Sequence, residues 1–260
     1  MSASKGERVA SQPGSPLRLA LLGIAALLAF AGFVALGNWQ VHRRAWKLDL
    51  IHRVDVRLQA EPAAAPPRAQ WAGLNAANDE YRRLCTDGAF LHDRETLVQA
   101  VTRLGAGFWV LTPLQETTGD IVLVNRGFVP AERSTSAARA AGQVPGPVRV
   151  CGLLRTSEPR GGFLRRNDAA AGRWYSRDVA AIAAARGLAA ADVAPYFIDA
   201  DDSPNPGGWP VGGLTVVRFH NSHLAYAITW YALALMVAGA AAIVGRHEWR
   251  LRRPGAVLKY

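Results

Sequence analysis

Two long apolar stretches lie near the two ends of the chain. They cover residues 19–37 and 224–245, and neither contains Asp, Glu, Lys or Arg. At a rise of about 1.5 Å per residue, a helix of about 20 residues spans the roughly 30 Å of a bilayer's hydrocarbon core. Both stretches are therefore predicted to be transmembrane helices. A cleaved signal peptide is the alternative for the first, but the run is long for such a segment.

The first helix is expected to continue beyond its apolar run. Trp39, Arg43, Trp46 and Leu50 are spaced four, three and four residues apart, which places them on one helical face. Trp39 would lie at the level of the lipid headgroups, where tryptophan is enriched. The proline-rich residues 61–68 then predict a break and a linker.

Between the two apolar runs, short β-type segments alternate with turn residues. Expected strands lie within 80–90, 95–103, 107–115, 120–130, 148–155, 172–178, 195–200 and 213–219. Residues 178–187 favour a helix with an Asp178 cap and a Gly187 stop, and Asp192 is a candidate cap for a further turn. The pattern predicts an α+β domain with an antiparallel sheet or a partly closed barrel.

The basic residues are unevenly placed, although the net charge of +10 at first suggests a nucleic-acid partner. Five of them follow the second apolar run: Arg246, Arg250, Arg252, Arg253 and Lys259. Basic residues beside a membrane helix favour the cytoplasmic side, so we expect a lipid bilayer and no nucleic acid as partner.

This charge distribution also predicts the orientation of the chain. It gives a cytoplasmic tail at 1–18, an extracytoplasmic domain at 38–223 and a cytoplasmic basic tail at 246–260. Arg43, Arg44 and Lys47 depart from this preference of basic residues for the cytoplasmic side, because they lie just beyond the apolar run of the first helix.

The motifs of common enzymes are not found in the sequence. It has no G-x-S-x-G, P-loop, G-x-G-x-x-G or H-E-x-x-H, so we expect no enzyme. Cys85 and Cys151 do not form a C-x-x-C motif. They could form a disulfide in an oxidising compartment, but small buried groups in strands are the favoured interpretation.

Two histidines lie at the start of the second apolar run. His220 and His223 are three residues apart and could share a helical face, or could sit in the headgroup layer beside capping Asn221 and Ser222. Further along the same helix, His223 is followed at three-to-four spacing by Tyr226, Ala227, Trp230 and Ala234. This stripe could form the wall of a flat hydrophobic ligand site or a belt packed against the first helix.

Two groups of residues in the central domain are further candidates. Asn125-Arg126-Gly127, with Arg155 and Glu158, could form a binding surface. A turn shaped by Gly127 and a structural network of charges is the favoured interpretation. Trp174 and Tyr175 are expected in the core.

The order of several short motifs resembles a known family. These motifs are LGNWQVHRRAWKLDLI (36–51), TPL (112–114), VLVNRGFVP (122–130), GLLRTSE (152–158), WYSRD (174–178), PGG (206–208) and NSHLAYAITWYALA (221–234). They are similar to the Surfeit locus protein 1 family of cytochrome c oxidase assembly factors. The resemblance implies a helix at each end and a domain on the outer side of a bacterial plasma or mitochondrial inner membrane.

The same resemblance implies that haem a is bound and inserted into subunit I of the oxidase, with His223 as iron ligand. Partners would be subunit I and the proteins that make or deliver haem a. A scaffold that stabilises subunit I without binding haem is the alternative. Where the family pattern has Asn-Asn-His-Leu-Gln-Tyr-Ala, this chain has Ser222 and Ala225, which removes a polar group near the expected ligand.

We further expect the other haem contacts to come from the helix ends. They are Tyr226, Trp230, Arg218, Arg43 and Trp39, with the two arginines suited to the propionates. Phosphate headgroups are an equal alternative for Arg43. The short, acid-containing stretch before the first helix favours the bacterial inner membrane over an organelle.

Overall fold

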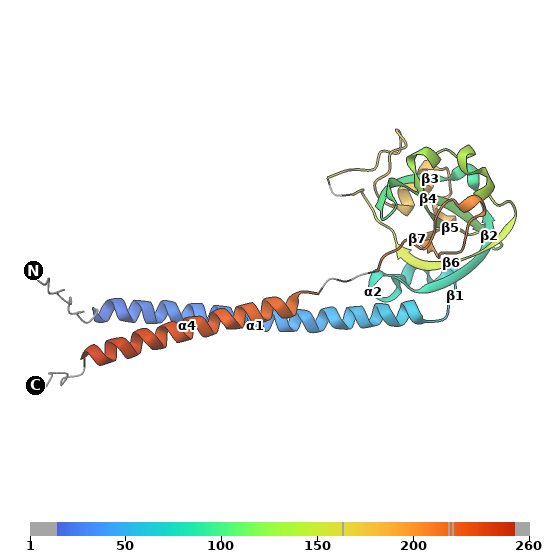
Figure 1. The fold of residues 1–260 in the computed structure, drawn as a ribbon. Helices are drawn as coiled ribbons and strands as arrows, with labels where there is room; N and C mark the ends of the chain where they lie inside the picture. Colours follow the sequence, from blue (N-terminus) through green and yellow to red (C-terminus); the bar gives the residue numbers. More distant parts are fainter. Residues whose placement is uncertain (1–14, 163, 218, 220, 253–260) are drawn as a thin grey trace, which may run out of the picture. The chain divides into compact units, whose positions relative to one another are not determined.

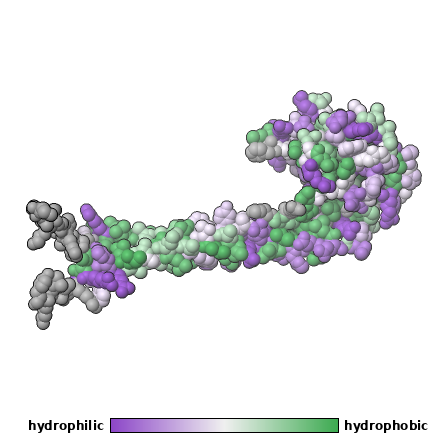
Figure 2. All heavy atoms as spheres, in the orientation of Figure 1, coloured by the Kyte–Doolittle hydropathy of each residue, from purple (hydrophilic) through white to green (hydrophobic). Residues whose placement is uncertain are grey.

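The computed structural model describes residues 15–252, except 163, 218 and 220. Two helices, α1 (Pro16–Gln59) and α4 (His223–Arg252), are long and apolar enough to cross a membrane. Figure 2 shows apolar side chains gathered along this helix pair. The chain divides into a helical unit, which reaches Ile51 and resumes at Phe219, and a domain from His52 to Arg218.

The domain is built on a seven-stranded sheet that curls into a barrel (Figure 1). Its strands are β1 (Ala63–Ala64), β2 (Arg83–Phe90), β3 (Thr96–Thr102), β4 (Gly105–Glu116), β5 (Ile121–Pro130), β6 (Pro147–Thr156) and β7 (Val193–Ala200). The order is β1-β2-β6-β7-β5-β4-β3, and β2 also pairs with β4. This extra pairing closes a ring of five strands, which confirms the predicted partly closed barrel. The pairs β5–β7 and β1–β2 are parallel, a feature that the expectation of an antiparallel sheet or partly closed barrel did not include.

Few helices accompany the barrel, as predicted. They are α2 (Ala76–Asp79) and α3 (Val179–Ala185), with short 3-10 segments at Arg68–Gly73, His92–Arg94, Ala131–Arg133, Ala137–Gly142, Ala190–Asp192 and Pro206–Gly208. Asp178 caps α3, because its Oδ1 accepts a hydrogen bond from the amide of Ala181. Gly187 follows α3 with φ +65°, a left-handed conformation that glycine adopts readily. Asp192 ends its short turn instead of capping it.

Apolar side chains bury both faces of the sheet. The barrel interior holds Leu84, Leu114, Val122, Val124, Val150, Leu154, Ala194, Tyr196 and Ile198. A second cluster packs α3 and Trp174 against the other face, around Leu111, Leu123 and Phe197. Trp174 is therefore a core residue, as expected, and the helix on one face of the sheet gives the α+β architecture.

Three local predictions were wrong. Residues 172–178 form only isolated bridges, of Trp174 with Val98 and of Arg173 with Asp168, and the side chain of Trp174 is buried. Residues 213–217 are not a strand. Gly127 lies inside β5, not in a turn, with φ +132°. An added Cβ there would come within 2.2 Å of the carbonyl oxygen of Val211, so only glycine permits this close approach.

A buried carboxylate, that of Asp199 in β7, joins several segments of the domain. Its residue is only 2% exposed. Arg155 Nη1 and Arg177 Nη1 contact its two oxygens at 2.7 and 3.0 Å. Asn125 and Thr215 donate further hydrogen bonds at 2.7 and 2.9 Å. The predicted structural role of Asn125 and Arg155 is thereby confirmed.

Each arginine of this cluster has a second carboxylate partner. Arg155 Nε donates to Glu80 at 2.7 Å, and Arg177 Nε donates to Glu158 at 3.0 Å. Burial would lower the pKa of Arg155, but Asp199 and Glu80 raise it above its usual value. Burial alone would raise the pKa of Glu158, yet hydrogen bonds from Arg177 lower it overall. Glu158 thus stabilises the fold at neutral pH, and this contribution is lost as the pH falls through its lowered pKa.

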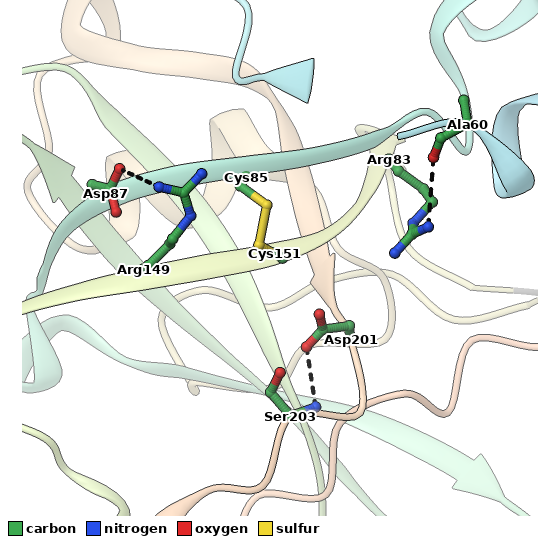
Figure 3. The surroundings of a disulfide bond; sticks show 8 residues. All are labelled: Ala60, Arg83, Cys85, Asp87, Arg149, Cys151, Asp201 and Ser203. Carbon is green, nitrogen blue, oxygen red and sulfur yellow. Dashed lines mark hydrogen bonds and ion pairs between the residues drawn. A yellow bond between two sulfur atoms is a disulfide. The ribbon is translucent and has the colours of Figure 1, made fainter. Parts of the chain in front are cut away.

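A disulfide joins Cys85 of β2 to Cys151 of β6 (Figure 3). The two residues lie directly opposite each other in the antiparallel pairing. Their carbonyls point away from each other, to Ala65 and Asp201, so this is a non-hydrogen-bonded pair. The side chains are closest at such positions. Buried free cysteines, the favoured expectation, are therefore wrong: strand register brings together residues 66 positions apart.

We predict that Asp199→Asn lowers the free energy of unfolding by about 3–5 kcal/mol, because it leaves part of two buried cations uncompensated. Denaturant unfolding of the full chain in detergent measures this loss. Asp87→Asn is the matched control, since Asp87 pairs with Arg149 at an exposed site at 3.5 Å. It should cost less than about 1 kcal/mol. Equal effects of the two variants would contradict the central role of Asp199.

We predict that replacing both Cys85 and Cys151 by serine lowers the free energy of unfolding by about 2–4 kcal/mol, because a long loop of the unfolded chain is no longer closed. Wild-type protein treated with a reductant should lose a similar amount, while the double variant should not respond to the reductant. A wild type whose unfolding midpoint is insensitive to reduction would contradict the assignment.

Candidate functional site

The second long helix begins at His223, the residue on which the expected ligand chemistry depends. Its first turn is closed by the amide of Tyr226, which donates to the carbonyl of Ser222 at 3.2 Å. His223 is half-buried, so its side chain is neither fully exposed nor fully enclosed between the helices.

The imidazole of His223 is held by a residue of the other long helix. Its Nδ1 lies 2.7 Å from Oε1 of Gln40 in α1. With Nδ1 donating to this amide oxygen, a neutral imidazole would keep the lone pair of Nε2 free. Among the described residues, no hydrogen bond engages Nε2. A neutral imidazole oriented through one nitrogen and open at the other is the arrangement found in protein metal ligands.

The stripe that follows His223 packs against α1. Ala227 and Ala234 are buried, and the ring of Trp230 stacks on Phe33 with centroids 5.8 Å apart. These three residues therefore pack against the first helix, which was one of the two alternatives for the stripe. Trp230 as a haem contact stays a prediction.

The two helices pack closely at Gly37. A Cβ on this residue would lie 2.6 Å from the ring of Tyr231, so the bare backbone accommodates the ring. The hydroxyl of Tyr231 donates to Oδ1 of Asn38 at 2.7 Å. Small residues that let helices approach, with polar groups bonded across them, are typical of membrane helix pairs.

The remaining expected contacts lie on exposed surface or outside the described residues. Trp39 and Tyr226 are 57% and 55% exposed. The guanidinium of Arg43 lies 4.2 Å from the centre of the Trp46 ring. Among described residues, no hydrogen bond or ring contact joins these three to His223. Arg218, and the rival ligand His220, lie outside the described residues.

An apolar groove of about 410 Å³ lies between α1 and α4, lined by residues such as Gly23 and Ala240. Its first lining residue on α4 is Val237, 14 positions after His223, or about 21 Å along a helix. The groove is therefore separate from the imidazole.

Sequence reasoning missed Gln40, the partner of the imidazole. Gln40 is 8% exposed and lies four residues before Arg44. In this stretch only tryptophan and basic residues were considered as contacts. One signal was available. Asn38 and Gln40 directly follow an apolar run, where an uncharged amide is costly unless it finds a partner. Both do, at Tyr231 and His223.

Known proteins are similar to this chain over most of its length. The model of the SURF1 family matches residues 27–235, which include Gln40 and His223. A SURF1-like protein of Monosiga brevicollis is 37% identical over 90% of this chain and 89% of its own length. Surfeit locus protein 1 of Rattus norvegicus is 38% identical over 76% of this chain and 67% of its own, and that of Homo sapiens is 37% identical over 76% and 69%. This chain belongs to the SURF1 family.

Proposed function

We propose that this protein is an assembly factor for cytochrome c oxidase, which binds haem a through His223 and aids its insertion into the haem–copper subunit I. Membership of the SURF1 family supports the assembly role. The observation that supports haem binding is the oriented imidazole, with Nδ1 bonded to Gln40 and Nε2 open.

The residues present suit the chemistry of this cargo. Haem a supplies an iron that accepts imidazole nitrogen, carboxylates that pair with arginine, and a long apolar tail. His223 would hold the iron through Nε2, and Gln40 would fix the tautomer and the ring orientation. The departure at Ala225 matters less in this arrangement, because Gln40 on the other helix provides the hydrogen bond.

Further contacts would come from side chains near His223 in sequence or on α1. The exposed ring of Tyr226 and the exposed Trp39 offer apolar surface, and Arg43 offers a cation. Arg43 is not committed to a carboxylate among the described residues, so propionates or lipid phosphates are both suitable partners. Arg218 and Trp230 complete the proposed set.

We further propose that the barrel domain lies on the periplasmic side of a bacterial inner membrane. Basic residues gather after the apolar part of α4, which favours the cytoplasm for that end. The disulfide in the barrel suits an oxidising compartment. Proteins that make or deliver haem a would then meet this one at the membrane, and no covalent chemistry by the chain is required.

We predict that His223→Ala removes haem a from the protein. The measurement is an absorption spectrum of protein purified in detergent from cells that make haem a. His42→Ala is the matched control, since His42 is an exposed histidine of α1, and it should keep the haem.

A colourless wild type, purified despite available haem a, would contradict this function. The scaffold alternative, in which the protein stabilises subunit I without binding haem, would then account for the family role. Full haem in His223→Ala would transfer the ligand role to another residue, with His220 the next to replace.

We predict that Gln40→Leu weakens haem binding by about 10- to 100-fold, because the imidazole loses the acceptor that orients it. Gln40→Glu keeps an acceptor and should retain most of the affinity. Titration of apoprotein with haem a, followed by absorbance, gives both dissociation constants. Equal affinity of Gln40→Leu and the wild type would show that the bond to His223 does not serve binding.

A further inference from the structure

A buried arginine of the barrel domain is a second candidate for ligand binding. It is Arg126 of β5, which is 3% exposed. Its Nη2 donates to the carbonyl of Gly142 and to Oδ1 of Asn205, the latter at 3.1 Å. Its Nη1 is buried and has no hydrogen-bond partner among the described residues. A buried donor without an acceptor is costly, and this one belongs to a charged group.

The guanidinium of Arg126 also lacks an ion-pair partner among the described residues. It lies 4.7 Å from the centre of the Phe90 ring. Glu95, the nearest acidic influence, is held by two hydrogen bonds from Arg139. Burial lowers the pKa of Arg126 to about 10, so the group stays charged at neutral pH.

Arg126 lines a cavity of about 190 Å³. The walls are largely apolar and include Phe90, Val124, Val148, Val150, Pro204 and Pro206. The polar groups at the same cavity are Arg149, Asn205, Ser203 and Asp201. The carboxylate of Asp201 accepts a hydrogen bond from the amide of Ser203, and Arg149 pairs with Asp87, as Figure 3 shows. The cavity thus combines one deep unpaired cation with an apolar lining.

We propose that this cavity binds a carboxylate on a short apolar stem, with Arg126 Nη1 donating to a carboxylate oxygen. Arginine donors match carboxylate geometry, and the ligand would supply the missing acceptor and the missing negative charge. A volume of about 190 Å³ is below that of a site for drug-sized ligands, so the occupant is a small acid or a single residue of a protein chain. The site does not depend on the haem role of His223.

The test uses the full chain in detergent and calorimetric titration with two acids and their amides. 3-Phenylpropionate represents a free small acid, and N-acetyl-leucine represents the C-terminal residue of a protein. Both acids carry the carboxylate and stem, whereas 3-phenylpropionamide and N-acetyl-leucinamide lack the charge. We expect at least one acid to bind at least tenfold more tightly than its amide, and the preferred acid identifies the source.

Two variants locate the binding. Arg126→Gln removes the cation, and Val148→Phe fills the cavity from a partly exposed wall position without altering the arginine. Each should weaken binding of the acid at least tenfold. Arg83→Gln, an exposed arginine whose Nη1 donates to the carbonyl of Ala60 at 3.5 Å, is the control and should leave binding unchanged. If Arg126→Gln fails to fold, Val148→Phe alone carries the test.

Four results would overturn the proposal. The first is that neither acid binds at 10-fold molar excess over millimolar protein, and the second is that the acids bind no more tightly than their amides. The third is that Val148→Phe binds the acid with wild-type affinity. The fourth is that sulfate binds as tightly as the acids. The last would assign a plain anion site without a role for the apolar walls. Haem spectra of the same variants separate this result from the fate of the proposed haem role.

Discussion

The carboxylate of Asp199 is the interaction on which the barrel domain depends. It accepts bonds from Arg155, Arg177, Asn125 and Thr215, which lie on β6, the loop before α3, β5 and the segment after the barrel. Burying a charge is unfavourable unless it is paired and fully hydrogen-bonded, so these segments are held to one mutual arrangement. The parallel pairing of β5 with β7 brings Asn125 opposite Asp199, and thus the barrel register and the charge cluster require each other.

The helix pair obeys a different constraint, since it is made of side chains that a bilayer accepts. Two hydrogen bonds between the helices each join an amide of α1 to an aromatic or imidazole group of α4. Where water is scarce, such a bond has no easy replacement, so it orients a side chain more strictly than it would on a soluble surface. The contact between His223 and Gln40 is of this kind, and it orients the imidazole.

Much of the fold follows from local sequence pattern. Charge-free runs predicted α1 and α4, and alternating apolar residues predicted β2 to β7, because both signals lie within single elements. Pairing across the sheet is not a local property. Cys85 and Cys151, Asn125 and Asp199, and the parallel neighbours β5 and β7 meet only through register, which spacing along the chain does not reveal. Residues 172–178 were misjudged for a related reason: Trp174 is buried by packing, not by strand pairing.

The close approach at Gly37 has a consequence for where the imidazole lies along the helix pair. Tyr231 fits its ring against the bare backbone of Gly37 and bonds to Asn38, which resists sliding of α4 along α1. His223 lies eight residues, or about 12 Å, before Tyr231 on the same helix. A slip by one turn would move it by about 5.4 Å, away from Gln40. Gly37 therefore helps to fix where His223 lies along α1, and with it the contact that orients the imidazole.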